Sequence, residues 1–190
     1  MVVRLSQRLY RLSRGLEKVE PKHQTAAQRG EIVELDYLDD PSLEPPYFTE
    51  KEFLRVEGQR LEFCNVGNRG IEKRYTEFFE ALDKVVDLIG DQLVLVVIPD
   101  EYQVNDTLFT DVLATRDDPE SYDRDYPQKR IAEWNRDRNI PLIDLLPTLR
   151  EAEPTGRTYH LRDTHWNARG NRVAGEHIAE VLIQLSKETE

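Results

Sequence analysis

The 190-residue chain has one cysteine, few aromatic residues and no long apolar run. A single cysteine, Cys64, excludes an internal disulfide bond and any zinc site built from several thiolates, because both need at least two sulfur atoms. Its apolar neighbours Phe63 and Val66 favour a small buried side chain over a reactive thiol. Aromatic residues make up 8% of the chain and charged residues 33%, which is typical of a small core within a well-solvated surface.

Positive charge is scarce relative to negative charge. The chain has 26 basic and 37 acidic side chains, and the net charge of -11 repels phosphate backbones and anionic lipids, so we expect no nucleic-acid partner. No stretch approaches the roughly 20 apolar residues of a membrane-spanning helix, and the first residues lack the apolar centre of a signal peptide. We therefore expect a chain that is soluble as written, does not insert into membranes, and forms one domain over residues 1–190.

The spacing of apolar residues predicts several amphipathic helices. They are expected over about residues 3–18, 71–89, 105–114, 128–138 and 168–187. The first would dock on the core, although its arginines leave a membrane-surface or partner-binding helix as an alternative. Gly90 supplies a stop for the second. The proline-bearing stretch 20–50 predicts an irregular loop or insertion with a short strand near 32–38.

Continuous apolar runs at 93–99 (LVLVVIP) and 140–146 (IPLIDLL) predict strands buried on both faces. Two shorter runs, at 53–56 and 61–66, flank Gly58 and predict a β-hairpin. The alternation of helices and strands predicts an α/β three-layer sandwich with a mostly parallel sheet. Reacting groups in such sheets collect beyond the carboxyl ends of the strands, which directs attention to segments 99–106 and 159–167 and to the loop after Leu146.

The segment 159–167 carries the chemistry, because Asp163 lies two residues before His165. An extended backbone places residues i and i+2 on the same side, so the carboxylate can reach the imidazole. Such a carboxylate selects the imidazole tautomer and stabilises the imidazolium formed in general-base catalysis. An Asp-x-His pair alone is common, and a purely structural pair is its default interpretation.

The longer string that begins at Asp163, DTHWNARGNRVAGEHIAEVL, resembles the last block of the bacterial SGNH/GDSL hydrolase superfamily. The resemblance is to the branch that includes relatives of alginate-type O-acetyltransferases. It implies a flavodoxin-like, SGNH hydrolase-like domain in which Asp163 and His165 complete a Ser-His-Asp triad. The expected activity is that of an esterase or O-acyltransferase on a small-molecule or carbohydrate ester, without cofactor or metal. The compartment stays open, because enzymes that the chain resembles are often exported or anchored through an amino-terminal segment.

Two neighbours of the pair are candidate substrate-binding residues. Trp166 could wall an acyl or sugar pocket, with Asn167 beside it, although a tryptophan next to a helix start more often packs against the core.

The family's Gly-Asp-Ser nucleophile block has no counterpart in the chain. None of the five serines, Ser6, Ser13, Ser42, Ser121 and Ser186, is predicted as a nucleophile. The dipeptide Asn105-Asp106 resembles an oxyanion block only superficially, because it follows a strand of the second half. We therefore expect an incomplete fold, the C-terminal part of a longer enzyme whose serine lies in absent preceding sequence.

Other interpretations remain open. The main alternative is a non-catalytic α/β binding or scaffolding module with a degenerate site. A metal site at His160, Asp163 and His165 has suitable donor atoms but is opposed by crowding within six positions. The acidic run 117–125 lacks the ligand order of a calcium loop and predicts a solvated loop. We expect His177 to be structural, and the sequence carries no prediction of oligomeric state.

Overall fold

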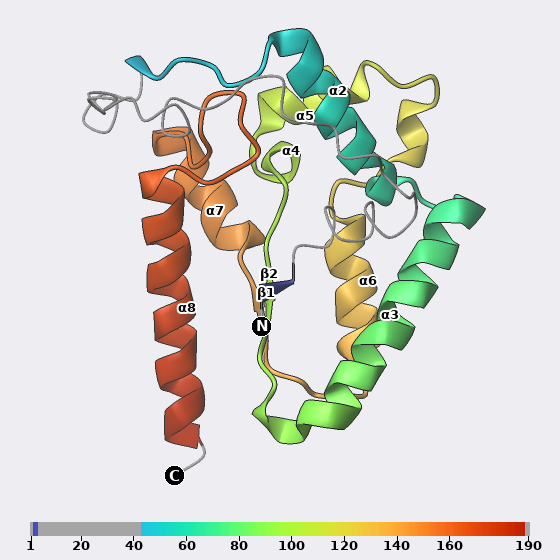
Figure 1. Ribbon diagram of the computed structural model, residues 1–190, viewed down its shortest axis with the longest axis vertical. Helices are drawn as coiled ribbons and strands as arrows, with labels where there is room; N and C mark the ends of the chain where they lie inside the picture. Colours follow the sequence, from blue (N-terminus) through green and yellow to red (C-terminus); the bar gives the residue numbers. More distant parts are fainter. Residues whose placement is uncertain (1, 4–42, 189–190) are drawn as a thin grey trace, which may run out of the picture.

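The computed structural model describes residues 2–3 and 43–188, and these residues form a mostly helical α/β fold with a small parallel sheet (Figure 1). The strands are β1 (Val2–Val3), β2 (Leu95–Val97) and β3 (Leu142–Asp144). The helices are α2 (Glu50–Leu61), α3 (Arg69–Ile89), α4 (Glu101–Val104), α5 (Asp106–Leu113), α6 (Tyr126–Asn135), α7 (Leu146–Ala152) and α8 (Ala168–Glu188). Short 3-10 turns are η4 (Glu62–Cys64), η5 (Gly90–Gln92), η6 (Pro119–Ser121) and η7 (Glu153–Thr155).

The sheet has the order β1-β2-β3, and both pairings are parallel. Val96 of β2 is in register with Val2 on one side and with Ile143 on the other. The two apolar runs therefore form the predicted strands, but the regular pairing covers only three residues of each. All three strands end at the same edge, from which α4 and α7 begin.

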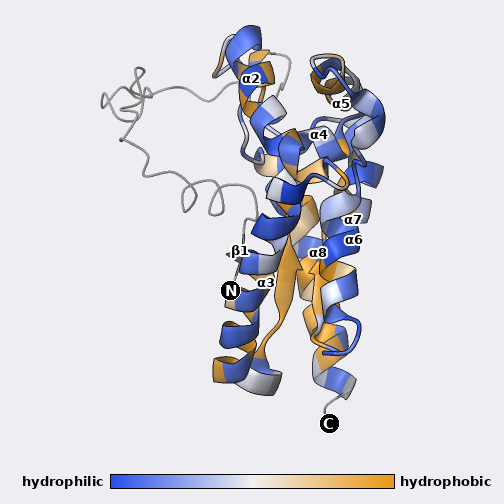
Figure 2. Cartoon of the chain, turned by 90° about the vertical axis from the view of Figure 1, so that its right-hand side faces the viewer, coloured by the Kyte–Doolittle hydropathy of each residue, from blue (hydrophilic) through white to orange (hydrophobic). Residues whose placement is uncertain are grey.

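Helices cover both faces of this sheet. Leu95 and Val97 pack with α3 and α6 in one apolar cluster that includes Phe79 and Trp134. The intervening Val96 packs in a second cluster with α7 and α8. Figure 1 shows α3 and α6 on one side of the strands and α7 and α8 on the other, and Figure 2 shows the apolar strands between them. Among the described residues, no helix is both long enough and apolar enough to cross a membrane.

Helix α2 replaces the β-hairpin predicted for residues 53–66, so that prediction was wrong. Thr49 caps the helix by accepting a hydrogen bond from the Glu52 amide at 3.3 Å. Gly58, predicted to form the hairpin turn, is buried within α2 beside Arg116 and Val112. The apolar residues of the predicted strands instead lie on a helical face that packs against α4 and α5, with Phe53 and Leu61 in a third cluster around Tyr102.

The other helix predictions divide into those confirmed and those outside the described residues. Helices α3, α5, α6 and α8 confirm four of the five, and Gly90 ends α3 with φ of 66°. The helix expected over 3–18 lies outside the described residues except for Val3, which belongs to β1. The strand expected near 32–38 and most of the loop 20–50 also lie outside them. Helix α7 occupies the segment that was predicted as a loop after Leu146.

Candidate active site

The segment that precedes α8 folds back on itself as a short hairpin over residues 158–167, which we call the Asp-x-His hairpin. An antiparallel bridge joins Tyr159 to Trp166. The His160 amide donates to the His165 carbonyl at 3.0 Å, and the Asn167 amide donates to the Thr158 carbonyl at 3.1 Å. Arg162 lies at the tip with φ of 50°, a left-handed conformation that reverses the chain. Thr164 and His165 form a bend within this reversal, so the extended backbone expected around residues 163–165 is not observed.

The Asp-x-His hairpin brings Asp163 and His165 into contact. His165 Nδ1 lies 2.7 Å from Asp163 Oδ1. Burial raises the pKa of Asp163, but the hydrogen bond and charge of His165 outweigh burial, and the net pKa is below its usual value. Because an ionised carboxylate only accepts hydrogen bonds, Nδ1 carries the proton and Nε2 is the basic nitrogen. The imidazole side chain is 56% exposed and the carboxylate 21% exposed, so the pair lies at the surface.

The pair is located beyond the carboxyl end of the sheet. Tyr159, which begins the hairpin, is buried and its hydroxyl donates to the Pro99 carbonyl at 2.7 Å, two residues after β2 ends. Burial raises the pKa of Tyr159 well above its usual value, which keeps the hydroxyl protonated as a donor. Figure 1 shows the hairpin next to the starts of α4 and α8. The structure therefore places Asp163 and His165 at the edge of the sheet where the sequence predicted reacting groups.

The residues that follow the pair anchor the start of α8. Asn167 is buried, and its side-chain amide donates to the carbonyls of Arg157 and Tyr159 at 2.7 and 3.1 Å while its oxygen accepts from the Gly170 amide at 2.9 Å. A Cβ atom on Gly170 would lie 2.0 Å from the Thr158 carbonyl oxygen. The helix start and the hairpin base touch at this point, and only glycine fits there.

Trp166 is half-buried and packs against the cluster around α7 and α8. Packing of this kind was the default interpretation of the tryptophan. It does not test the substrate-binding role predicted for Trp166, and that role stays a prediction, as does the one for Asn167.

His160 faces a different carboxylate from His165. Its Nδ1 contacts Glu44 Oε1, and Glu44 Oε2 accepts from Arg157 at 3.1 Å. The donor atoms of His160, Asp163 and His165 are thus split between two imidazole–carboxylate pairs. Across the part of the chain that is described, no group of three or more His, Cys, Asp or Glu side chains has an arrangement that could hold a metal ion.

A buried group of charged residues directly after β2 had no counterpart in the sequence analysis. Glu57 of α2 is 0% exposed and accepts from Arg60 at 2.9 Å, and Arg60 also lies 3.4 Å from Asp100. Burial raises the pKa of Glu57 to about 7 and that of the neighbouring Glu101 to about 9. One carboxylate oxygen of each glutamate, Oε2, has no hydrogen-bond partner among residues 43–188. We refer to Glu57, Arg60, Asp100 and Glu101 as the buried acidic cluster.

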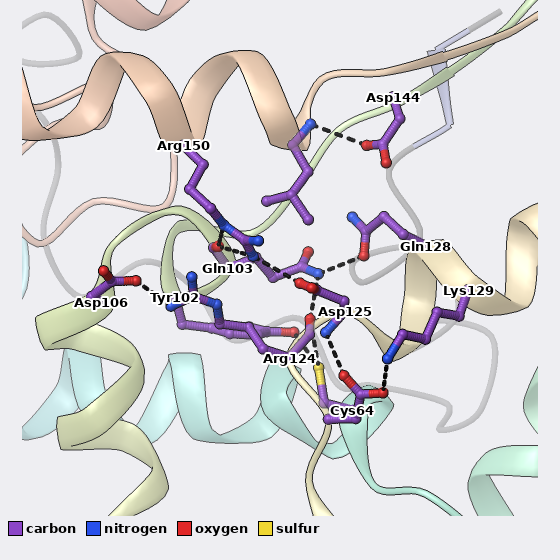
Figure 3. Close-up of polar contacts among 12 residues, drawn as sticks. Cys64, Tyr102, Gln103, Asp106, Arg124, Asp125, Gln128, Lys129, Asp144 and Arg150 are labelled. Carbon is purple, nitrogen blue, oxygen red and sulfur yellow. Dashed lines mark hydrogen bonds and ion pairs between the residues drawn. The ribbon is translucent and has the colours of Figure 1, made fainter.

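A hydrogen-bond network ties the carboxyl ends of β2 and β3 together (Figure 3). Arg150 of α7 donates to the Gln103 carbonyl at 2.8 Å and to Asp125 at 2.7 Å. The Gln103 side chain donates to the Arg124 carbonyl at 2.9 Å, which is also within 3.7 Å of Cys64 Sγ. Cys64 is fully buried and burial raises the pKa of its thiol, so the predicted burial of this cysteine is confirmed.

The described serines lie elsewhere in the fold. Ser186 is near the far end of α8, about 27 Å along the helix axis from its start at a rise of about 1.5 Å per residue. Ser121 donates to Asp118 in the η6 turn. Asn105, considered as an oxyanion residue, caps α5 and donates to Glu153 at 3.2 Å. The three remaining serines, Ser6, Ser13 and Ser42, lie outside the described residues.

The hydrogen-bonded Asp163–His165 pair before the last helix of a parallel α/β fold resembles the corresponding part of an SGNH hydrolase-like domain. Comparison with protein families matches residues 51–190 to ALGX, described as the SGNH hydrolase-like domain of the acetyltransferase AlgX. The chain therefore belongs to this family. Comparison with curated proteins gave no match, and comparison with solved structures gave none either.

Proposed function

We propose that Asp163 and His165 are the acid–base pair of a Ser-His-Asp triad in an O-acetyltransferase or esterase of the AlgX family. The observation that carries the proposal is the 2.7 Å contact between His165 Nδ1 and Asp163 Oδ1, with the imidazole exposed at the carboxyl edge of the sheet. Membership of the family supports acetyl transfer as the proposed reaction and a carbohydrate acyl compound as the proposed substrate. The serine would come from polypeptide outside the 190 residues.

In the first half of the proposed reaction, His165 Nε2 takes the proton of the serine hydroxyl while the serine oxygen attacks the carbonyl carbon of the acyl ester. The tetrahedral intermediate collapses, the bond to the leaving alcohol breaks, and that alcohol takes the proton from Nε2. In the second half, a sugar hydroxyl or water gives its proton to Nε2 and attacks the acyl-serine. The serine oxygen then leaves with the same proton.

Asp163 keeps the imidazole in the required state throughout. It accepts from Nδ1, which fixes the tautomer that leaves Nε2 basic, and its negative charge stabilises the imidazolium of each half-reaction. The lowered pKa of Asp163 means that the carboxylate stays ionised at neutral pH. Partial burial of Asp163 favours this contact over contact with water, because the local dielectric is lower.

The neighbours of the pair have different proposed roles. We propose that the exposed part of Trp166 lines the acyl or sugar pocket, since it follows His165 directly. The three hydrogen bonds of the Asn167 side chain are made within the protein, which favours a positioning role for Asn167 over direct contact with substrate.

The helices on both faces of the sheet support a three-layer, flavodoxin-like sandwich as the arrangement of a single domain over residues 1–190.

The test is labelling by a serine-directed fluorophosphonate. We expect no labelling of the 190-residue chain alone, and labelling of the protein expressed with the coding sequence that flanks it in its gene. The His165→Ala variant of the longer protein should lose that labelling. Failure of the longer wild-type protein to react would overturn the proposal.

The same experiment addresses a second candidate, a non-catalytic binding or scaffolding module. The observation in its favour is the position of Ser121 and Ser186, away from the Asp163–His165 pair. A gene without a serine block, together with an unreactive protein, would support this candidate.

A further inference from the structure

We propose that Glu44 is a positioning residue for the Asp163–His165 pair and that it acts through His160 and Arg157. This inference rests on the proposed function, because it concerns the geometry of the same pair. Glu44 is 113 residues or more from its partners in sequence, and its side chain is only 7% exposed. A carboxylate at such a site needs strong partners to offset the loss of hydration.

Glu44 has two such partners, His160 on the first arm of the Asp-x-His hairpin and Arg157 directly before that arm. One oxygen contacts His160 Nδ1, and the other accepts from Arg157 at 3.1 Å. A single carboxylate therefore bridges two residues that flank Thr158 and Tyr159. The first arm of the hairpin pairs with Trp166 and Asn167.

The backbone of His160 makes the connection to the catalytic pair. Its amide donates to the His165 carbonyl at 3.0 Å, and its carbonyl accepts from the Asp163 amide at 3.2 Å. The residue that Glu44 holds by its side chain thus holds both members of the pair by its main chain. The Arg157 carbonyl in turn accepts from the Asn167 side chain at 2.7 Å, on the other side of His165.

Residues 44–50 extend this contact along the hairpin tip, and we call them the strap. The amides of Tyr47 and Phe48 donate to the carbonyls of Leu161 and Arg162 at 3.1 and 3.2 Å. Glu50 accepts from Arg162 at 3.0 Å, but this ion pair is exposed. Because Arg162 has a left-handed conformation, the tip depends on such outside contacts to keep its shape.

The charged groups around His160 fit this role. Glu44 faces it from the strap and Arg157 from the hairpin base, and the charge of His160 contributes to the lowered pKa of Asp163. Two imidazole–carboxylate pairs therefore lie next to each other on one hairpin, one anchored by the strap and the other exposed. The anchored pair fixes the backbone on which the exposed pair is built.

The experiment follows the His165 Nδ1–H proton by NMR in the 190-residue chain, with Glu44→Gln and the matched control Glu50→Gln. In the wild-type chain we expect a tautomer protonated at Nδ1 and a proton protected from solvent exchange. Glu44→Gln should raise the exchange rate of that proton about tenfold or more and mix the tautomers, while most backbone amide shifts stay unchanged. Glu50→Gln, which removes only the exposed ion pair, should leave the His165 signal as in the wild type.

Two variants of His160, the partner of Glu44, distinguish a positioning role from a general effect on stability. Asn at position 160 retains a donor near the place of Nδ1, so His160→Asn should restore much of the protection that His160→Ala loses. If Glu44→Gln leaves the His165 proton unchanged, the positioning role is wrong and the proposed triad is unaffected. If the wild-type chain lacks the Nδ1–H tautomer altogether, the proposed function fails as well.

Discussion

The Asp-x-His hairpin and the buried acidic cluster both place carboxyl groups next to a nitrogen-bearing hydrogen-bond partner beyond the end of β2, but their electrostatics are opposite. Asp163 contacts His165 at the surface, and its pKa is lowered. Glu57 contacts Arg60 in the interior, and burial nevertheless raises its pKa to about 7. Glu101 is 6% exposed and its pKa is raised further, to about 9.

The difference shows that hydration decides the state of a carboxyl group as much as its partner does. A partly exposed carboxylate such as that of Asp163 retains part of its hydration, so a hydrogen bond to an imidazole suffices to stabilise the charged form. A fully buried carboxylate loses several kcal/mol of hydration, and one guanidinium shared with Asp100 offsets only part of that cost. The hairpin is therefore suited to acid–base chemistry with an ionised aspartate, whereas the buried cluster retains protons near neutral pH.

The largest expected effect comes from removing the cation of the buried acidic cluster. Arg60→Ala leaves Glu57 and Asp100 without their shared partner, and we expect the free energy of unfolding at pH 8 to fall by about 3–5 kcal/mol. At pH 5 the loss should be smaller, because Glu57 then binds a proton in the folded state. Urea unfolding at both pH values measures the effect.

The control for this prediction is Lys73→Ala, which removes an exposed ion pair with Glu77 on α3. Exposed pairs of this kind contribute less than about 1 kcal/mol, so the control should be close to the wild type. Equal losses at pH 5 and pH 8 in Arg60→Ala would mean that packing of the arginine, and not the charge of Glu57, determines its contribution.

A slightly smaller loss is expected from Gly170→Ala, which deforms the hairpin without altering its charges. The new Cβ would lie 2.0 Å from the Thr158 carbonyl oxygen, and relieving that overlap must move either α8 or the hairpin base. We expect about 3 kcal/mol of destabilisation by thermal or urea unfolding. Gly175→Ala is the matched control in the same helix, since nothing lies within 4 Å of its Cβ position and alanine there should stabilise by about 0.5–1 kcal/mol.

The pH dependence of stability sharpens the comparison further. The pKa of Glu101 is about 9 in the folded state and near 4.5 in the unfolded chain, so between these values the folded state holds a proton that the unfolded state has lost. Stability from this group is therefore fully present below pH 4.5 and is lost as the pH rises towards 9. Glu101→Gln has no such proton, and its stability relative to the wild type should rise by about 2 kcal/mol between pH 5 and pH 6.5. Parallel pH profiles for the two proteins would contradict the assignment.

Much of the fold could be predicted because the patterns that carry it are local and long. Helices α3 and α8 extend over several turns with apolar residues at helical spacing, and the apolar run before Pro99 has only a buried strand as a reasonable outcome. Helix α2 was missed because its apolar residues were assigned to strands and Gly58 to a turn. The Thr49–Glu52 spacing, which matches a helix-capping signal, could have corrected that assignment.

The candidate site likewise combines a contact that could be predicted from the sequence with others that could not. The contact between Asp163 and His165 was predictable because the two residues are only two positions apart, although it forms in a bend and not in the extended segment that was expected. The burial of Glu57 and Glu101 was not predictable, because nothing next to them in sequence distinguishes them from solvated glutamates, and their surroundings come from α2 meeting α4. The bridge from Glu44 to His160 likewise joins residues that only the folded chain brings together.

The smallest expected effect on stability, and the most informative about function, is that of Asp163→Asn. The lowered pKa means that Asp163 stabilises the fold above its unfolded pKa and that this contribution is lost as the pH falls through the lower folded value. Because Asp163 is partly exposed and its partner His165 is mostly exposed, solvent screening should keep the loss at pH 7 below about 1 kcal/mol, and the loss should vanish under acidic conditions. The rate of fluorophosphonate labelling in the serine-containing protein should nevertheless fall by a factor on the order of 10³–10⁴, since asparagine favours the wrong imidazole tautomer. A large loss of stability with unchanged labelling would reverse the comparison, making the hairpin pair structural and leaving the surface imidazole without a catalytic role.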